Sequence, residues 1–177
     1  MSVEEYLAWD DRTEARADYH DGEVFEPEAS SLPHGVLLAN LAGCLTSRLR
    51  RSGCVVSING PRVQVASRKF VYPDVLVFCG RPAPVAGQPD TVTDAKWIAE
   101  VLSPSTLDYD YGTKFALYRK LPSLLEYVLV SQSDRTVEVF RRNEAGQWVL
   151  STYEGRDAAF ESLGVSVPLD EIYGGVL

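Results

Sequence analysis

The sequence predicts an α/β fold in which helices cover the faces of a β-sheet and a β-rich segment follows at the C-terminal end. The chain has 177 residues, 45% of them hydrophobic, which is enough for one buried core, so we expect a single domain spanning residues 1–177. Short strand-like apolar runs alternate with segments whose leucines recur at helical spacing. No repeat and no linker divides the chain.

The N-terminal part predicts a helix, a hairpin and a second helix. Ser2 and Glu5 form a capping box that starts a short helix. Asp21-Gly22, between two short alternating runs, indicates a hairpin. A longer helix begins near Pro33, because the apolar residues from Leu37 to Leu49 share one helical face.

The middle of the chain is predicted to be rich in strands. Cys54–Ile58, Arg62–Val65 and Phe70–Phe78 are three candidate strands. Gly80–Ala95 holds three prolines and two glycines, which indicates a loop long enough to act as a lid. Trp97–Leu102 is nearly all apolar, as expected for a strand covered on both faces.

A third helix and a β-rich tail complete the prediction. The helix follows Ser103-Pro104-Ser105 and runs to about Leu121, before Pro122. Three further strands are expected at Leu124–Val130, Thr136–Arg141 and Trp148–Tyr153. This β-rich tail carries the aromatic residues Phe140, Trp148 and Tyr153. Either the edge strands of the tail pair with those of a second copy across the two-fold axis of a homodimer, or the aromatic residues close a second small core.

Composition and charge exclude several classes of protein. With 17 basic and 25 acidic residues the net charge is −8, which argues against binding nucleic acid by bulk attraction. No stretch approaches ~18 uninterrupted apolar residues, so we expect no membrane span and no membrane partner. The first residues have neither the basic nor the apolar region of a secretory signal, and we expect a cytoplasmic protein.

The three cysteines are interpreted as thiols. Cys44, Cys54 and Cys79 are odd in number and lie in apolar surroundings, as expected for buried thiols in a reducing compartment. No Cys/His spacing predicts a zinc site.

Two carboxylates occupy strand positions where apolar residues are expected. Glu100 interrupts the run Trp97–Leu102, and Asp74 precedes another apolar run. A buried carboxylate needs a cation, a metal or a raised pKa, and two carboxylates side by side favour Mg²⁺ or Mn²⁺. The alternative is structural: Glu100 forms an ion pair and Asp74 caps a turn after Pro73.

Lys114 lies near the middle of an apolar helical stripe. At 100° per residue, Tyr118 and Leu121 fall beside it. A lysine at such a position either acts in a site or extends its ammonium group past an apolar stem to reach water.

Three further residues could contact a substrate. His34 opens the second helix, where a histidine is more often a helix-start or core residue than a functional one. Ser103 and Ser105 follow the Glu100 strand, and their hydroxyls either cap the next helix or donate to a substrate phosphate. Neither a phosphate-binding glycine loop nor a Gly-x-Ser-x-Gly motif is present, which argues against NTPases and esterases.

These segments together resemble one family across nearly the whole chain. They are Glu4-Glu5-Tyr6-Leu7, Asp21-Gly22-Glu23, His34, Tyr72-Pro73-Asp74-Val75, Glu100-Val101-Leu102-Ser103-Pro104-Ser105-Thr106 and Asp110-x-Gly112-x-Lys114-x-x-Leu117-Tyr118. The chain is similar to the Uma-two family of restriction endonuclease-like proteins, within the PD-(D/E)XK nuclease superfamily. The resemblance implies a central mixed β-sheet flanked by helices, here with a β-rich C-terminal extension.

The resemblance also implies roles for residues. Asp74 matches the aspartate of the Pro-Asp element, and Glu100 matches the acid of the (D/E)-X-K element. The third residue of that element is Leu102, and the lysine is found on the next helix as Lys114. The further acid of the superfamily's first core helix is missing here, and His34 occupies the comparable end of that helix. Asp18 or Glu23 could supply an outer carboxylate.

The implied activity is Mg²⁺-dependent or Mn²⁺-dependent endonucleolytic hydrolysis of DNA. Asp74, Glu100 and the Val101 carbonyl would hold the metal, and Lys114 would orient a water or neutralise charge on the phosphate.

Two alternatives remain open. One is a binding or assembly protein that keeps the fold with little catalysis, which the −8 charge favours. The other is a two-carboxylate glycosidase, against which Lys114 argues. Basic residues of the early middle form either a local DNA-binding patch or an ordinary solvated surface; they are Arg48, Arg50, Arg51, Arg62, Arg68 and Lys69.

Overall fold

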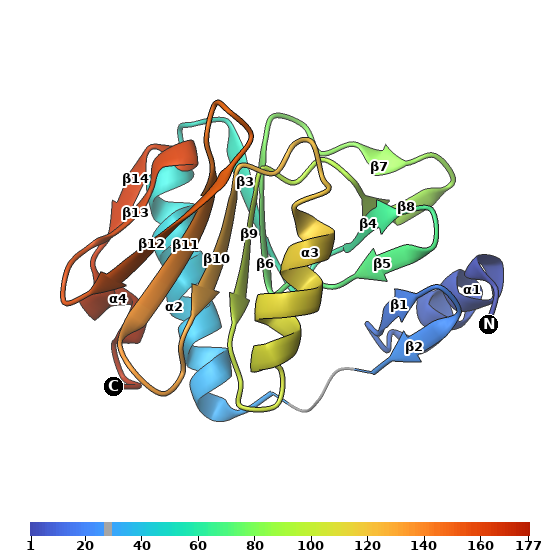
Figure 1. The fold of residues 1–177 in the computed structure, drawn as a ribbon, viewed down its shortest axis with the longest axis horizontal. Coiled ribbons are helices and arrows are strands. Elements are labelled where there is room, and N and C mark those ends of the chain that lie inside the picture. The colour runs from blue at the N-terminus through green and yellow to red at the C-terminus, as the bar shows by residue number, and fades with distance from the viewer. Residues whose placement is uncertain (27–29) are drawn as a thin grey trace.

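Most strands lie in two six-stranded sheets, in the part of the chain that the structure describes, residues 1–26 and 30–177 (Figure 1). The structure is a computed structural model of mixed α/β class. The elements in chain order are α1 (Val3–Thr13), β1 (Asp18–His20), β2 (Glu23–Phe25), α2 (Leu32–Leu49), β3 (Cys54–Ile58), β4 (Arg62–Ala66), β5 (Lys69–Val71), β6 (Val75–Cys79), β7 (Pro84–Val85), β8 (Gln88–Val92), β9 (Trp97–Val101), a π-helical turn (Tyr109–Lys114) that leads into α3 (Phe115–Tyr118), β10 (Glu126–Val130), β11 (Thr136–Arg142), β12 (Trp148–Glu154), β13 (Ala158–Phe160), a 3₁₀ turn (Glu161–Leu163), β14 (Val165–Val167) and α4 (Leu169–Tyr173).

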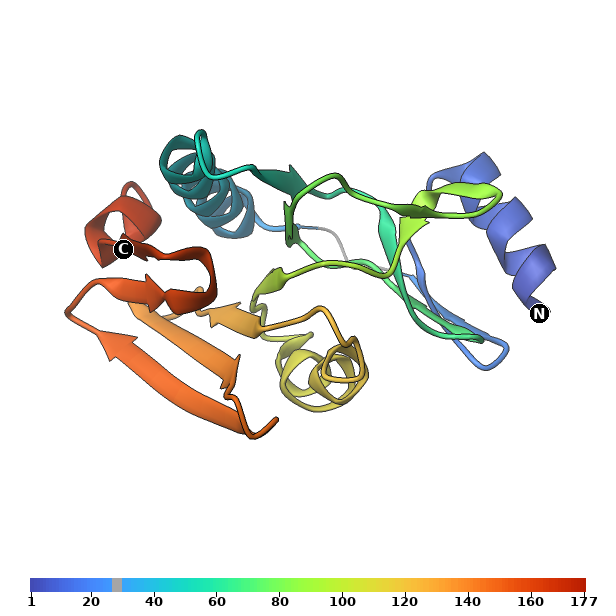
Figure 2. The same cartoon turned by 90° about the horizontal axis from the view of Figure 1, so that it is seen from above.

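The larger apolar cores lie on the two faces of the first sheet, whose strand order is β12-β11-β10-β9-β6-β3. β9 and β10 pair in parallel and the other neighbours pair antiparallel, so the sheet is mixed. Successive strand residues face opposite sides. Val75, Val77 and Trp97 pack in the core that α2 covers, whereas Leu76 and Ile98 pack in the core that α3 covers. The two helices therefore lie on opposite faces of this sheet (Figure 2).

The second sheet has the order β2-β1-β5-β4-β8-β7 and carries α1. The capping box of Ser2 and Glu5 starts α1 as predicted. Tyr6 of α1 stacks on Tyr19 of β1, with ring centroids 4.6 Å apart, and also contacts Phe70 of β5. This small aromatic core attaches the N-terminal segment to the second sheet.

The predicted strand Phe70–Phe78 is wrong, because the chain passes there from one sheet to the other. Phe70 belongs to β5 of the second sheet, and Phe78 belongs to β6 of the first. Side chains take the backbone N–H groups in between: Tyr72 donates to Asp18, and Asp74 donates to Glu100. Proline has no N–H to donate at the position between them. With these donors engaged by side chains, no strand ladder runs through this segment.

The prediction of a lid at Gly80–Ala95 is also wrong. β7 and β8 form a hairpin there, and β8 pairs in parallel with β4. Gly87 supplies the positive φ of 76° at the hairpin turn, so a glycine that suggested a loop allows a tight connection. Val92 and Ala95 are buried.

The helix predicted to reach about Leu121 ends at Tyr118. The N–H of Leu121 donates to the carbonyl of Tyr118, a tighter spacing than in an α-helix. The guanidinium group of Arg142 donates to the carbonyls of Arg119 and Leu121. These carbonyls are satisfied without another helical turn.

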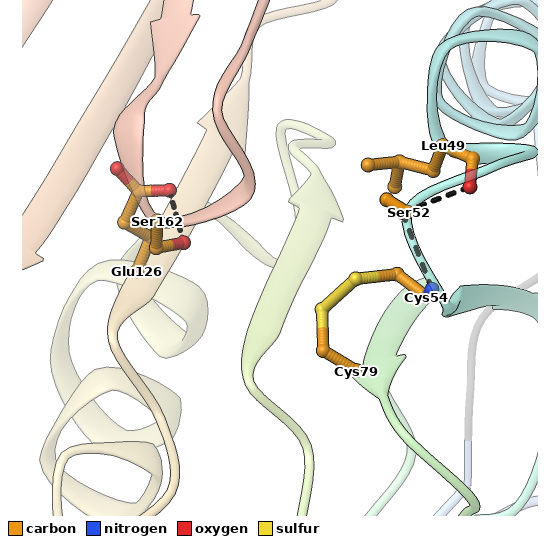
Figure 3. The surroundings of a disulfide bond; sticks show 6 residues. All are labelled: Leu49, Ser52, Cys54, Cys79, Glu126 and Ser162. Carbon is orange, nitrogen blue, oxygen red and sulfur yellow. Dashed lines mark hydrogen bonds between the residues drawn. A yellow bond between two sulfur atoms is a disulfide. The ribbon is translucent and has the colours of Figure 1, made fainter.

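The interpretation of all three cysteines as thiols is wrong for two of them. Cys54 of β3 and Cys79 of β6 lie directly opposite each other and form a disulfide (Figure 3). Their pairing depends on strand register between residues 25 positions apart, which no local pattern reveals. Cys44 is a free, partly buried thiol that donates to Glu171.

The tail differs from the prediction in its extent. β10, β11 and β12 extend the first sheet, and only β13, β14 and α4 form a separate layer near α2 (Figure 1). Phe140 and Trp148 pack against Phe115, and Tyr153 is buried in the α2 core. These aromatics therefore take part in cores within the chain, and the homodimer remains a prediction.

The basic residues that were expected either to form a local DNA-binding patch or to lie on a solvated surface include one that is buried. Arg62 is 2% exposed and bonds to Asp10 and Asp11 of α1. Arg68 and Lys69 pair with Asp21. Within residues 1–26 and 30–177, no helix is both long and apolar enough to cross a membrane.

Candidate functional site

A cleft of about 690 Å³ collects most of the predicted site residues. Its walls come from the N-terminal hairpin, the start of α2, the connection between β5 and β6, the end of β9 and the π-helical turn. The predicted residues that line it are His34, Asp74, Glu100, Val101, Ser103, Ser105 and Lys114. Segments far apart in the sequence thus meet where the chain crosses between the two sheets.

Asp74 and Glu100 are neighbours because β6 and β9 pair antiparallel, with Val75 opposite Ala99. The backbone N–H of Asp74 donates to Glu100 Oε2 at 3.2 Å. The N–H of Val101 donates to Asp74 Oδ2 at 2.8 Å. Each carboxylate thus accepts a backbone N–H from the chain segment that carries the other carboxylate. The side chain of Asp74 therefore does more than cap a local turn.

Lys114 lies inside the cleft wall, with 11% of its side chain exposed. Its Nζ is 3.0 Å from Glu100 Oε1 and donates to the carbonyl of Tyr72 at 3.3 Å. The interpretation of a side chain that extends to water is therefore wrong. The helical-stripe prediction placed Lys114 correctly, and Glu100 has the ion pair that its burial requires.

Asp110 is a second buried carboxylate beside Lys114. Its Oδ1 lies 3.5 Å from Nζ, and the residue is 2% exposed. The turn that carries both residues is π-helical, because the N–H of Phe115 donates to the Asp110 carbonyl five positions earlier. The buried hydroxyl of Tyr127 donates to the same carbonyl at 3.0 Å. Tyr127 thereby stabilises the backbone that directs Asp110 toward Lys114.

His34 contacts Asp74 from the start of α2. Its Nε2 is 3.2 Å from Asp74 Oδ2, and Ser31 caps the helix by accepting the His34 N–H. The hydrogen bond to Asp74 raises the pKa of His34 against the opposing effect of burial. Burial alone would raise the pKa of Asp74, but the bond to His34 and the charges of His34 and Lys114 lower it. Asp74 is therefore held as a carboxylate.

The charges around Lys114 are unbalanced. Burial would lower its pKa, but four surrounding carboxylates raise it well above the usual value; they are Glu100, Asp18, Asp110 and Asp74. Burial raises the pKa of Glu100 and of Asp110, and neighbouring carboxylates add to the effect. The ammonium group therefore stays charged, with four carboxyl groups around it.

Of the two candidate outer carboxylates, the structure brings Asp18 into the cleft and leaves Glu23 exposed outside it. Asp18 Oδ2 accepts from the hydroxyl of Tyr109 at 2.8 Å, and that hydroxyl is 2.5 Å from His20 Nε2. Burial lowers the pKa of His20.

Ser103 and Ser105 lie at the cleft and at the start of the helix that contains the π-helical turn. Ser103 Oγ accepts the N–H of Thr106 and is 3.0 Å from Ser105 Oγ. Ser103 therefore caps the start of this helix, which is one of the two predicted roles. The hydroxyl groups of Ser103 and Ser105 both lie in the cleft wall.

Asp110 is a site residue that was not predicted as a candidate from the sequence. A usable signal was present, because Asp110 precedes Lys114 by four positions and shares its helical face. Arg16 was not predicted either; it lines the cleft and lies over the Tyr72 ring, 4.6 Å from its centroid. Nothing local in the sequence indicates that contact.

A metal site made by the protein alone is not found in residues 1–26 and 30–177. No three side chains of histidine, cysteine, aspartate or glutamate lie together in a suitable arrangement there. The oxygen donors of the cleft include the paired carboxylates of Asp74 and Glu100.

Comparison with known proteins agrees with the sequence motifs. The model of the Uma2 family, described as "Putative restriction endonuclease", matches residues 3–169. "Uncharacterized protein slr1290" of Synechocystis is 32% identical over 178 residues, covering 99% of this chain and 93% of that protein. A second Synechocystis protein, "Uncharacterized protein sll1609", is 30% identical over 162 residues, covering 91% and 92%.

A solved structure shares the fold. The crystal structure of a "putative nuclease belonging to DUF820" from Anabaena variabilis matches with a TM-score of 0.80 at 15% sequence identity, covering 100% of this chain and 99% of that one. The family match spans nearly the whole chain and confirms the resemblance. The chain belongs to the Uma2 family.

Proposed function

We propose that this protein is a metal-dependent endonuclease that hydrolyses DNA phosphodiester bonds on a restriction endonuclease-like scaffold. The observation that carries the proposal is the pairing of Asp74 and Glu100 on adjacent strands, with buried Lys114 against Glu100. The mixed sheet between α2 and α3, with the β13–β14 extension, supports the scaffold. Membership of the family described as "Putative restriction endonuclease" supports the reaction class.

The donor set fits Mg²⁺ or Mn²⁺. Mg²⁺ is commonly bound through one or two carboxylates, with waters and substrate phosphates as the other ligands. Asp74 and Glu100, with the Val101 carbonyl, would hold such an ion, and the gathering of carboxyl groups around Lys114 favours it. When bound, the ion would supply Lewis-acid polarisation of the phosphate and a lower pKa for a nearby water.

The chain's own residues would serve the hydrolysis in distinct ways. Lys114, held as an ammonium ion, would stabilise negative charge that develops on the phosphate oxygens. His34 fixes the orientation of Asp74 through its hydrogen bond. Ser103 and Ser105 would donate to a phosphate of the bound strand. The water oxygen forms the new bond to phosphorus, and the leaving oxygen departs with the electron pair of the broken bond and is protonated.

One observation favours a second candidate function. The net charge is −8, and Arg62 and Lys69 of the candidate patch are paired with aspartates, whereas DNA binding gains from clustered lysine and arginine. A binding or assembly protein with little catalysis would fit these charges. It would keep the cleft without turnover.

Calorimetric titration of Mn²⁺ into the protein tests the metal site. We expect one site in the wild type, its loss in Glu100→Gln, and its retention in Glu144→Gln, which removes an exposed carboxylate. Absence of binding by the wild type would count against the metal centre.

Cleavage of plasmid and single-stranded DNA in Mn²⁺ or Mg²⁺ then tests the reaction. Asp74→Asn should abolish the activity, and Lys114→Met should lower its rate by about 10²–10³-fold. Activity that survives in both variants would contradict the proposed function. One metal site with no cleavage of either DNA would favour the binding protein.

A further inference from the structure

Asp110 presents an unexplained feature beside the proposed metal centre. Within the described residues, its buried Oδ1 has no hydrogen-bond partner, although the ammonium group of Lys114 is only 3.5 Å away. A buried carboxylate oxygen without a hydrogen bond is costly. The same ammonium group forms the shorter ion pair with Glu100 Oε1, at 3.0 Å, and donates its hydrogen bond to the Tyr72 carbonyl.

The proposed function creates a conflict at Glu100. Its Oε1 forms an ion pair with Lys114 and accepts from the Tyr118 hydroxyl, and its Oε2 accepts the N–H of Asp74. A divalent ion on the Glu100 carboxylate would repel the ammonium group at 3.0 Å. Lys114 must therefore have another place for its charge when the ion binds.

Asp110 is positioned to supply that place. It lies four residues before Lys114 on the same helical turn, and the Tyr127 hydroxyl fixes its backbone carbonyl. A lysine side chain has a flexible stem with a compact charged end, so a short movement of Nζ needs no change of the backbone. As a carboxylate, Asp110 would carry the opposite charge, and its Oδ1 has no hydrogen-bond partner among the described residues.

We propose that Asp110 is the alternative acceptor of the Lys114 ammonium group, which moves from Glu100 Oε1 to Asp110 Oδ1 when Glu100 binds the divalent ion. The inference rests on the proposed function and makes Asp110 a positioning residue. It keeps Lys114 charged and inside the cleft, next to the phosphate, while Glu100 is released for the metal.

Mn²⁺ affinity provides the first test. Asp110→Asn keeps the side-chain shape and should weaken Mn²⁺ binding by about 10-fold to 100-fold, the usual effect of losing a residue that supports a metal ligand. Asp108→Asn is the matched control, because it removes one exposed carboxylate from the same helix. The control should change the affinity less than about twofold.

The same substitution in a Lys114→Met background separates this role from direct ligation. Without an ammonium group to relocate, Asp110→Asn should affect Mn²⁺ affinity no more than Asp108→Asn does. A loss of the same size in both backgrounds would overturn the proposal and identify Asp110 as a metal ligand.

A crystal structure of the wild type with bound Mn²⁺ is a third test, and it does not depend on whether the variants fold. We expect Nζ within hydrogen-bond distance of Asp110 and displaced from Glu100. An ammonium group that stays on Glu100, or a normal Mn²⁺ affinity in Asp110→Asn, would overturn this inference alone. Failure of the wild type to bind Mn²⁺ would overturn the proposed metal centre and the inference with it.

Discussion

Replacing Lys114 with methionine should destabilise the protein by about 3–5 kcal/mol at neutral pH, the usual cost of removing one partner of a buried ion pair. Glu100 is 2% exposed, and its Oε1 lies 3.0 Å from the lysine Nζ. At an effective dielectric constant of ~20, two unit charges at that distance attract by about 5 kcal/mol. Methionine restores most of the packing of the lysine stem but none of this attraction.

The loss should depend on pH. Burial and nearby carboxylates raise the pKa of Glu100 in the folded state above its unfolded value, and removal of Lys114 raises it further. The stabilisation from the proton on Glu100 is therefore fully present below the unfolded pKa and is lost as the pH rises through the folded pKa. Each such proton changes the free energy of unfolding by at most about 1.4 kcal/mol per pH unit. The deficit of the variant relative to wild type should shrink from pH 8 to pH 5.

Urea denaturation of wild type and Lys114→Met at several pH values measures this effect. Lys120→Met is the matched control, because Lys120 is exposed near the end of the same helix and should cost less than about 0.5 kcal/mol. Adding Glu100→Gln to Lys114→Met should recover part of the loss, since no charge then remains at that position. Equal stability of the two lysine variants, or a deficit that does not change with pH, would refute the reasoning.

Two further predictions concern stability. Replacing Cys54 and Cys79 with serine should lower the free energy of unfolding by about 3.5 kcal/mol, because the disulfide closes a loop between residues 25 positions apart in the unfolded chain. A reducing agent should lower the stability of the wild type but not that of the serine variant. Arg62→Met should lower the free energy of unfolding, measured by chemical denaturation, by about 3–5 kcal/mol, because it leaves the fully buried Asp10 carboxylate without its cation. Arg48→Met, which breaks a partly exposed pair, should cost less than about 1 kcal/mol, and a similar loss in both arginine variants would contradict this account.

Features that depend on local sequence were predicted well. The apolar run of β9 is buried on both faces, as its composition indicates. Helical geometry alone placed Lys114 among buried residues, because a helix fixes the direction of each side chain relative to its neighbours. The metal hypothesis and the family resemblance both assumed that Asp74 and Glu100 lie side by side, and the structure places them so, although their roles remain a prediction.

Features that depend on partners distant in the sequence were not predicted. Apolar periodicity continues from Phe70 to Phe78, but it cannot show that Asp18 and Glu100 take the backbone N–H groups between the two strands. The disulfide needs the register of β3 against β6. The sheet to which each strand belongs is decided by such long-range contacts rather than by propensity.

The aromatic core of the N-terminal segment has a consequence for folding during synthesis. Tyr6 and Tyr19 stack on each other, but Phe70 completes their core and leaves the ribosome about 3–10 s after Tyr19 at ~5–20 residues per second. Until then α1, β1 and β2 lack the neighbouring strand β5. A nascent chain stopped before Phe70 should therefore stay unfolded and be open to chaperones and proteases.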